Sequence, residues 1–528
     1  MAGVQSNNKG IGMSALIALI ILAGLGIRIT GLWLGQGYCS IGPSDALEAY
    51  SVAVDYGRGE TSAQYLGQPN YNHHAKLPGP LWTMFCFAGL RSWGSIEGAI
   101  LGIILLNTAT IYLAYLLAVR TLGPSGAIFT AVGAATLPFA VYYSVSLYNP
   151  NVMPFLGGLL FLALWEVIQR ERSRAIFWVV LVLMIMPHFH MCVTMLLPAV
   201  GLVLLLSSVR LNLAWLFGGL LFGALLYVPY VRGEMMHGWH NTRGMLVAPC
   251  SYGWGSLKAL TAPVSLLTNW VPQWTGSAKA YLQLGRACFG SAWIFLIINF
   301  LSAIVAVLLV LRICQRVRAA MAGFWQAPRQ VFNRSQGLLF LTIVTAIPLL
   351  FAALYGKNFR SHYAIVLLTP LLALAGWAGA SWLASPRFGR GFAAALLVVT
   401  CGNAWFMPAM FRDQSLRIQK GDVFLASFRN LESVYQQLKA RAGTEHCVRI
   451  TEATFSSKVH EKEDLTEDVQ LIARYVTIRE KESVMLLGGP KTPMTYILRH
   501  AKETTQEDPA VVYRAHGIEL LASPDCPR

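Results

Sequence analysis

Two carboxylates lie in a polar stretch, residues 36–94, that separates the first two long apolar runs of the chain. Asp45 and Glu48 are three residues apart, so they share one face if residues 44–56 form a helix. At a membrane boundary, partial loss of water makes a carboxylate a stronger base, and we expect Asp45 to act as one. The alternative is an ordinary amphipathic helix with both acids in water, and the spacing alone favours this alternative.

Basic and aromatic side chains form two further clusters. The first cluster precedes a Leu-Pro-Gly-Pro corner and consists of His73, His74 and Lys76. The second cluster lies between two late apolar runs and consists of Lys357, Arg360, His362 and Tyr363. Such side chains can hold a phosphate group at a membrane surface while its hydrocarbon chain stays in lipid. For any one of them, a solvated cation without a ligand is the simpler interpretation. Because both clusters are expected on the side of the carboxylates, we predict that together they bracket one lipid phosphate.

Other polar residues give weaker signals. His188 and His190 interrupt an apolar run, but a metal site needs a third ligand at fixed spacing. We favour groups that line a cavity, or core histidines with hydrogen-bond partners. Asn149 and Asn151 flank a proline and predict a turn. The sequence holds no P-loop, nucleophile elbow or dinucleotide fingerprint, and we predict neither a metal nor another cofactor.

The composition is that of a membrane protein. Of 528 residues, 55% are hydrophobic and 12% are charged, whereas a soluble globular chain carries about 25% charged residues. The mean hydropathy is +0.51. The net charge of +16 comes from Lys and Arg in short loops between apolar runs, which indicates orientation in a bilayer and disfavours a nucleic-acid partner. The nine cysteines have no zinc or iron–sulfur spacing.

About eleven apolar runs are long enough, or nearly so, to cross a ~30 Å hydrocarbon core: 13–34, 97–119, 125–145, 152–168, 175–187, 191–208, 211–231, 289–311, 337–354, 363–383 and 391–410. The first is expected to remain as an anchor, because no small-residue cleavage site follows it. Residues 77–90 are apolar between polar flanks and predict an interfacial or re-entrant helix. The predicted fold is an all-α polytopic bundle with interfacial helices in the first outer loop.

Lys and Arg are concentrated in alternate loops, at Arg120, 170–174, Arg210, 312–334, and Arg387 with Arg390. Short loops rich in these residues stay in the cytoplasm. The opposite face then receives the carboxylate stretch 36–94, the long loop 232–287 and everything after residue 410. We therefore expect a multi-pass protein of the inner (plasma) membrane, with its amino terminus in the cytoplasm and its carboxyl-terminal part outside.

Residues 411–528 differ in character from the transmembrane module 1–410, because charged residues become frequent and apolar runs shrink to strand length. Strands are expected at residues 483–487 and 510–513, and helices at residues 467–475 and 494–502. We predict a small extracytoplasmic α/β domain. Cys447 and Cys526 could pair in an oxidising compartment or remain free thiols, and the sequence leaves both open.

Three short stretches resemble the GT-C superfamily of membrane glycosyltransferases, and within it the bacterial relatives of protein O-mannosyltransferases and lipid A aminoarabinose transferases. The family's acid in the first outer loop matches Asp45 in PSDALEAY, with Glu48 beside it. The family's Lys-Pro-Pro-Leu stretch is similar to AKLPGPLW, which places Lys76 at the lipid phosphate. The family's Arg-Tyr-rich approach to a late helix resembles FRSHYAIVLLTPLLALAG, which points to Arg360, His362 and Tyr363. Together with the topology, the resemblance covers residues 13–410.

Two departures from the family pattern affect the expected mechanism. The stretch AKLPGPLW has another residue in place of the first proline, and Asn151 stands where some relatives carry a second acid. The second departure disfavours a metal-dependent or two-acid mechanism.

The resemblance implies transfer of a hexose or pentose from a polyprenyl-phosphate donor to a hydroxyl of a glycan, lipid or protein acceptor on the outer face. Asp45 would take the proton of that hydroxyl as its oxygen attacks the anomeric carbon, which implies inversion. The leaving phosphate would be stabilised by Lys76, Lys357 and Arg360. One alternative is a transporter or flippase of lipid-linked saccharides, which needs access from both faces. A scaffold for the outer domain is another, but it gives no reason for the polar clusters.

Overall fold

The computed structural model describes most of the helical part of the chain and a few segments beyond it. The described residues are 4–34, 43–70, 75–247, 258–268, 278–355, 359, 361–420, 435–436, 475, 478–479, 497–500, 511–515 and 518–521.

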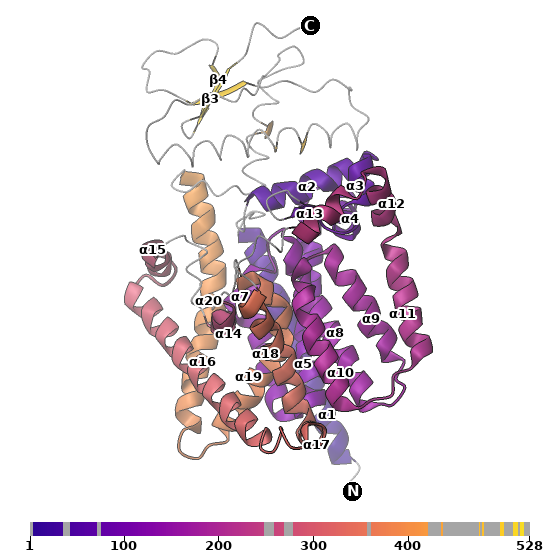
Figure 1. Cartoon of the computed structure of the whole chain (residues 1–528). Coiled ribbons are helices and arrows are strands. Elements are labelled where there is room, and N and C mark those ends of the chain that lie inside the picture. The colour runs from indigo at the N-terminus through magenta and orange to yellow at the C-terminus, as the bar shows by residue number, and fades with distance from the viewer. Residues whose placement is uncertain are drawn as a thin grey trace.

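Long apolar helices form the body of the molecule (Figure 1). Within the described residues, seven segments are long and apolar enough to cross a membrane: Met13–Leu34, Glu97–Leu122, Asn149–Gln169, Ala292–Ala320, Gln336–Leu354, His362–Leu383 and Gly389–Arg412. They lie in α1 (Val4–Leu34), α5 (Glu97–Leu122), η2 with α8 (Asn149–Val152, Met153–Gln169), α16 (Ala292–Ala320), α18 (Gln336–Tyr355), η7 with α19 (Ser361–Leu367, Leu368–Leu383) and α20 (Gly389–Lys420). The chain is a multi-pass membrane protein.

The remaining predicted spans are shorter or bent. Residues 211–231 form a pair of helices that meet at 44°, α11 (Leu213–Leu226) and α12 (Val228–Met236). Two others are short apolar helices with 3₁₀ turns at their facing ends: α9 and η3 (Ala175–Ile185, Met186–His188), then η4 and α10 (Met191–Leu196, Leu197–Ser207). Seven spans are thus confirmed by length and composition, and the count of eleven stays a prediction.

The predicted span 125–145 is broken. After η1 (Pro124–Gly126), α6 (Ala127–Thr136) ends where Leu137 adopts an extended backbone, and α7 (Pro138–Tyr142) begins at the next residue. Pro138 causes the break, because its ring disfavours a helical conformation at the preceding residue and it has no N–H to donate. The carbonyl of Ala134 therefore lacks the donor four residues on that an unbroken helix would supply.

Arg28, in α1, supplies donors at this break. Its side chain is buried, and it donates to the carbonyls of Ala134 at 2.8 Å and Ala135 at 3.2 Å. It also donates to the carbonyl of Gly24 at 2.9 Å and the hydroxyl of Ser144 at 3.0 Å. A charged side chain inside a span is costly unless such groups surround it. Arg28 therefore fixes α1 to the α6–α7 break, and the break leads directly into the Asn149–Val152 turn.

Helix α5 occupies the centre of the bundle and packs against α1, α4, α6, α8 and α19. Its buried face and that of α8 are mainly apolar, as in Ile103, Ile111, Leu160 and Leu164, although α5 also buries Asn107, Thr108 and Thr110. Shorter helices cover one end: α2 (Pro43–Gly57), α3 (Thr61–Tyr65), α4 (Leu81–Trp93), α12 and α13 (His240–Val247) (Figure 1). The predicted interfacial helix at 77–90 corresponds to α4. Three more complete the described helices: α14 (Lys258–Leu267), α15 (Ala278–Phe289) and α17 (Pro328–Arg334).

Two small antiparallel sheets accompany the helices. β1 (Pro69–Asn70) pairs with β2 (Ala75–Lys76) next to α4. The other sheet, in the carboxyl-terminal part, has the order β3 (Ile497–His500), β5 (Ile518–Leu521) and β4 (Val511–Ala515). Leu498 faces Leu520 across β3 and β5 in its register.

The carboxyl-terminal predictions had mixed outcomes. β4 confirms the strand expected at 510–513, whereas the helix expected at 494–502 is wrong, because Ile497–His500 is β3. Pairing with a neighbouring strand determined the conformation of this short segment, since its four residues pair with all four residues of β5. Helix α20 continues to Lys420, so the expected boundary at residue 411 falls within a helix. The strand at 483–487 and both Cys447 and Cys526 lie outside the described residues, as does the helix at 467–475 apart from Tyr475.

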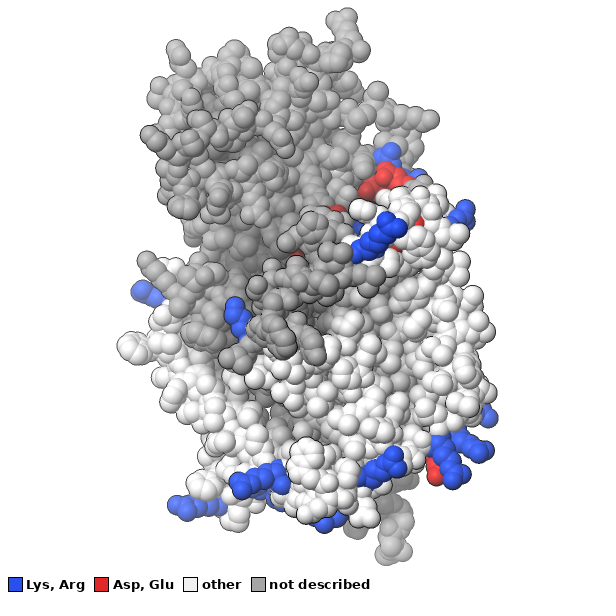
Figure 2. All heavy atoms as spheres, in the orientation of Figure 1, with Lys and Arg blue, Asp and Glu red and all other residues white. Residues whose placement is uncertain are grey.

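The distribution of charge along the long axis agrees with the predicted orientation. Figure 2 shows Lys and Arg side chains along the lower end of the described residues, and most visible Asp and Glu side chains at the upper end, where further Lys and Arg side chains accompany them. The amino-terminal end of α1 lies at the lower end, and the end of α20 lies at the upper end with α2 (Figure 1).

We predict that alkaline phosphatase fused after Lys420 is active, and that the same enzyme inserted after the exposed Trp325 is inactive. The reason is the concentration of Lys and Arg around the second position, which keeps that loop in the cytoplasm. Phosphatase activity in intact cells measures both, with fusions to green fluorescent protein as the reciprocal control. Activity at Trp325 and none at Lys420 would reverse the assignment of the two faces.

Candidate functional site

The structure describes five of the nine predicted site residues. Asp45 and Glu48 lie on α2, Lys76 ends β2, and His362 and Tyr363 lie in η7. The other four are outside the described residues: His73, His74, Lys357 and Arg360.

Helix α2 is amphipathic and largely covered. Asp45 and Glu48 are partly buried, while the residues between and after them are fully buried: Ala46, Leu47, Ala49, Tyr50, Ala53 and Val54. This apolar face packs on α4. The alternative interpretation of the sequence expected both acids in water, whereas each is partly buried in the structure.

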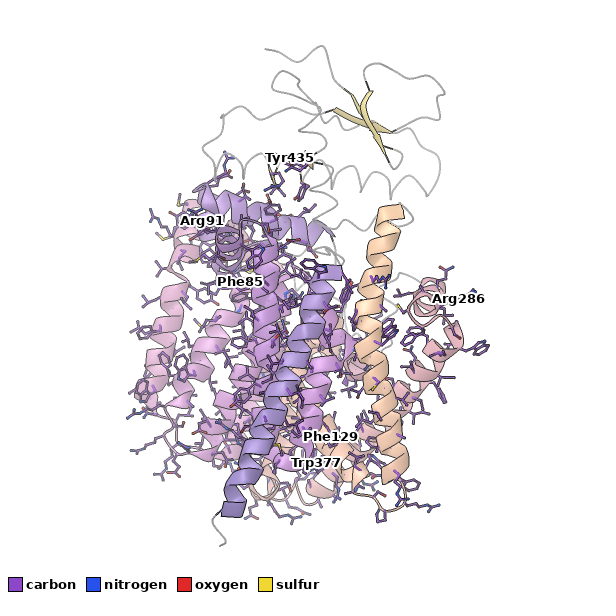
Figure 3. All side chains as sticks on the ribbon, turned by 180° about the vertical axis from the view of Figure 1, so that it is seen from behind. Phe85, Arg91, Phe129, Arg286, Trp377 and Tyr435 are labelled. Carbon is purple, nitrogen blue, oxygen red and sulfur yellow. The ribbon has the colours of Figure 1, made fainter. Side chains whose placement is uncertain are left out.

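Residues of the carboxyl-terminal part also contact α2. The Arg479 guanidinium donates to the Tyr50 hydroxyl at 3.4 Å and lies 5.5 Å from the centre of the Tyr435 ring. The Tyr475 ring lies 5.9 Å from that of Tyr50. Tyr435, labelled in Figure 3, is buried there, as is Ile478. Residues of the carboxyl-terminal part thus also hold the helix that carries Asp45.

Gln68 connects the backbone at Asp45 to the strand that carries Lys76. Its side-chain amide donates to the Asp45 carbonyl at 3.0 Å and accepts from the Trp82 indole N–H at 2.7 Å. Its own backbone carbonyl accepts from the N–H of Leu77, the residue after Lys76, at 2.9 Å. The side chain is buried, so each of these bonds replaces one with water. Gln68 therefore joins the backbone at Asp45 to the backbone at the end of the strand that carries Lys76.

A second polar group surrounds His362. Its Nε2 atom is 2.9 Å from the Tyr148 hydroxyl, and its ring packs at right angles to that of Tyr363 with 4.5 Å between centres. The ring of His190 lies 5.1 Å from that of Tyr363 and 6.3 Å from that of His362. Asn149 donates to the Phe189 carbonyl at 2.7 Å. The structure thus joins three motifs that the sequence marked separately.

The protonation of His190 follows from its contacts. Its Nδ1 atom accepts from the Cys192 backbone N–H at 3.1 Å, so the ring proton is on Nε2. Burial in the turn between η3 and η4 lowers the pKa of His190 to about 4. The ring is therefore neutral at pH 7 and provides an N–H donor. His190 confirms the prediction of a core histidine with a hydrogen-bond partner, whereas the ring of His188 packs against Gly79.

Aromatic contacts connect the two polar groups. Trp82, bonded to Gln68, lies 6.2 Å from the ring of Phe189, whose carbonyl accepts from Asn149. Phe85, labelled in Figure 3, stacks on Trp82 at 5.7 Å and meets Phe189 edge-on at 6.5 Å. These rings therefore form a continuous aromatic contact from Gln68 to the segment that carries His190.

Asn151 lies in the predicted turn, which is confirmed as η2. Its side chain is fully buried, donates to the carbonyl and the hydroxyl of Ser146 at 2.9 and 3.0 Å, and leaves its Oδ1 without a partner among the described residues. Asn107 of α5 donates to the Asn151 carbonyl at 2.7 Å. Among the described residues, no three His, Cys, Asp or Glu side chains are grouped to hold a metal ion.

Sequence reasoning missed Gln68, Trp82 and Tyr148 as parts of this site. Tyr148 directly precedes the Asn149–Asn151 turn that the sequence did mark. Gln68 and Trp82 gave no such signal, because their roles depend on partners elsewhere in the loop.

The whole fold is similar to that of ArnT from Cupriavidus metallidurans. The structure of ArnT bound to undecaprenyl phosphate matches with a TM-score of 0.54 at 12% sequence identity, over 98% of this chain and 99% of ArnT. The structure of ArnT in the apo state matches with a TM-score of 0.53 at 12% sequence identity, over 97% of this chain and 98% of ArnT. This chain has the fold of ArnT. No protein-family model matches the sequence, and no curated protein matches it.

The corner after Lys76 requires glycine at position 79. Gly79 has φ of +108°, and a Cβ atom there would collide with the ring of the buried His188. Gly59, in the same loop, also has a positive φ, +77°, but a Cβ atom would meet nothing within 4 Å. The two glycines thus share the backbone requirement and differ in the space available.

We predict that Gly79→Ala lowers the apparent unfolding temperature of the detergent-solubilised protein more than Gly59→Ala does. Both variants carry the cost of a positive φ, about 1–2 kcal/mol, and Gly79→Ala adds the displacement of His188, typically 1–3 kcal/mol. Thermal unfolding followed by intrinsic fluorescence measures the difference. Equal losses in the two variants would show that His188 is not packed under this corner.

Proposed function

We propose that this chain is a membrane glycosyltransferase that moves a sugar from a polyprenyl-phosphate donor to an acceptor hydroxyl on the outer face of the plasma (inner) membrane. The observation that carries the proposal is the pair of bonds made by Gln68, which join the backbone of the helix that carries Asp45 to the backbone of Leu77, next to Lys76. The fold of ArnT, whose structure holds undecaprenyl phosphate, supports a donor of the same kind.

In the proposed reaction, Asp45 is the general base. It accepts the proton of the acceptor hydroxyl while that oxygen forms a bond to the anomeric carbon of the sugar. The bond between that carbon and the phosphate oxygen breaks on the opposite side, so the configuration inverts and polyprenyl phosphate leaves. Positioning by the buried face of α2 and by Gln68 holds the carboxylate in place, and general base catalysis of this kind contributes roughly 10²–10⁴-fold.

The phosphate is proposed to lie near Lys76. This side chain belongs to a strand and is only partly buried, so its ammonium can reach the membrane surface. His362 and Tyr363 would face the same phosphate from the His362 group, together with Lys357, Arg360, His73 and His74. Charge-assisted contacts are the strongest that a protein can offer to a phosphate, and they would stabilise the charge that develops as the donor bond breaks.

A flippase of lipid-linked saccharides is a weaker proposal. Such a protein needs its ligand groups to be reachable from both faces of the membrane. The described residues that we assign to ligands instead lie near the short helices at one end of the bundle, where α2 and β2 are placed.

We predict that Asp45→Asn retains the fold and donor binding but lowers the turnover number by roughly 10²–10⁴-fold. The amide is nearly isosteric with the carboxylate but cannot accept the proton of the acceptor. Transfer of radiolabelled sugar from a synthetic polyprenyl-phosphate donor measures turnover.

Glu48→Gln is the matched control, since it makes the same chemical change one turn along α2, and it should have the smaller effect. Full inactivation by Glu48→Gln with normal turnover in Asp45→Asn would exchange the two roles. Full activity in both variants would place the chemistry elsewhere.

We predict that Lys76→Ala weakens binding of undecaprenyl phosphate, because removal of one charge-assisted contact typically costs ~1.5–3 kcal/mol. Lys258→Ala is the control, since Lys258 is an exposed lysine at the start of α14. Binding to the purified full-length protein in detergent measures both. Unchanged affinity in Lys76→Ala, or an equal loss in Lys258→Ala, would remove Lys76 from the phosphate site.

A further inference from the structure

The strand that carries Lys76 has two edges with different partners. On one edge, Leu77 donates to the Gln68 carbonyl at 2.9 Å and accepts from the Gly67 N–H at 3.0 Å. In an antiparallel pair, the backbone groups of successive residues point to opposite edges. The N–H and C=O of Lys76 therefore point away from β1, where another strand would be needed to satisfy them.

Asn241 takes the place of that strand. Its Oδ1 atom accepts from the Lys76 N–H, and its Nδ2 atom donates to the Lys76 carbonyl at 3.0 Å. Asn241 belongs to α13, is 165 residues away in sequence, and is buried. A primary amide carries one acceptor and one donor side by side, as a strand backbone does, so a single side chain satisfies both groups.

The orientation of this amide is fixed by a buried network from α12 and α13. The Nδ2 atom of Asn241 also donates to the Tyr230 hydroxyl at 3.3 Å, and that hydroxyl is 2.8 Å from Oγ1 of Thr242. The Thr242 N–H donates to the fully buried Glu234 carboxylate at 2.7 Å. Reversing the amide would direct its donor at the Lys76 N–H and its acceptor at the Lys76 carbonyl, so only one orientation is possible.

Helix α12 contacts the first outer loop at a second place. The Arg232 guanidinium lies 5.4 Å from the centre of the Tyr65 ring, and Gly233 packs against the same tyrosine. The α12–α13 segment therefore attaches to α3 and to β2, which precede and follow Gln68. These contacts leave the Lys76 backbone fixed on both edges.

We propose that Asn241 is a positioning residue for the donor phosphate, acting through the backbone of Lys76. The inference rests on the proposed function of Lys76. A long side chain on a fixed Cα atom has fewer conformations to lose when its ammonium binds, and ordering such a side chain costs about 0.5–1.5 kcal/mol. Without Asn241 this cost rises, because the strand edge itself becomes mobile.

The test is a double-mutant cycle on binding of undecaprenyl phosphate to the purified full-length protein. Asn241→Ala should weaken binding by about two- to tenfold, the equivalent of ordering one long side chain. In the Lys76→Ala background the same substitution should have no further effect, because the residue through which it acts is gone. Asn299→Ala is the control: it removes a comparable bond, from Nδ2 to the Phe295 carbonyl at 2.8 Å in α16, and should leave affinity unchanged.

The outcomes separate the inference from the proposed function. Unchanged affinity in Lys76→Ala would overturn the proposed phosphate contact, and this inference with it. A loss in Lys76→Ala with no loss in Asn241→Ala, or with the same loss from Asn241→Ala in both backgrounds, would overturn the role of Asn241 alone.

Amide hydrogen exchange tests the contact without reference to binding. Asn241→Ala should speed exchange at the Lys76 N–H and leave that of Leu77, which is bonded to Gln68, close to wild type. Asn241→Asp keeps the acceptor and should preserve protection at Lys76, while it loses the donor to the carbonyl. Equal exchange at Lys76 in the wild type and in Asn241→Ala would overturn the inference.

Discussion

Backbone groups that leave regular structure near a membrane must find new partners, and this requirement determines how the end of the protein that carries α2 and β2 is built. Two side chains meet it. Arg28 supplies donors to the carbonyls exposed at the α6–α7 break, and Asn241 bonds both backbone groups of Lys76. Gln68 adds a further bond to the Asp45 carbonyl, which lies in the first turn of α2. Each bond connects segments that are distant in sequence, so the cost of irregular backbone is offset by contacts that also fix the site.

The consequence for the proposed reaction is a site with several independent supports. Helix α2 packs on α4 and also contacts Tyr475 and Arg479 of the carboxyl-terminal part. The strand of Lys76 is bonded on both edges. General base catalysis requires this kind of fixed geometry, because a carboxylate contributes only when it is within hydrogen-bond reach of the proton that it abstracts.

Some buried polar atoms in this region stay unpaired among the described residues. They include Oδ1 of Asn151 and one oxygen of Glu234, on the Asn149–Val152 turn and helix α12. Unpaired groups of this kind are costly and uncommon in folded proteins. Others lie within the bundle, such as Oγ1 of Thr345 and of Thr369 on helices that pack against α5.

The sequence by itself determined the features that depend on local composition. Apolar length identified the seven confirmed spans, Pro150 between two asparagines identified the η2 turn, and the polar stretch 36–94 identified the end of the molecule where Asp45 and Lys76 lie. Tertiary structure alone decided which of these segments meet. Tyr148 and His362 are 214 residues apart, and Lys76 and Asn241 are 165 apart. Likewise Ile497–His500 became a strand because β5 lies beside it, although its spacing is helical. Local periodicity reports which face of a segment is apolar, but the partner of a buried amide or of a strand edge is set by how distant segments pack.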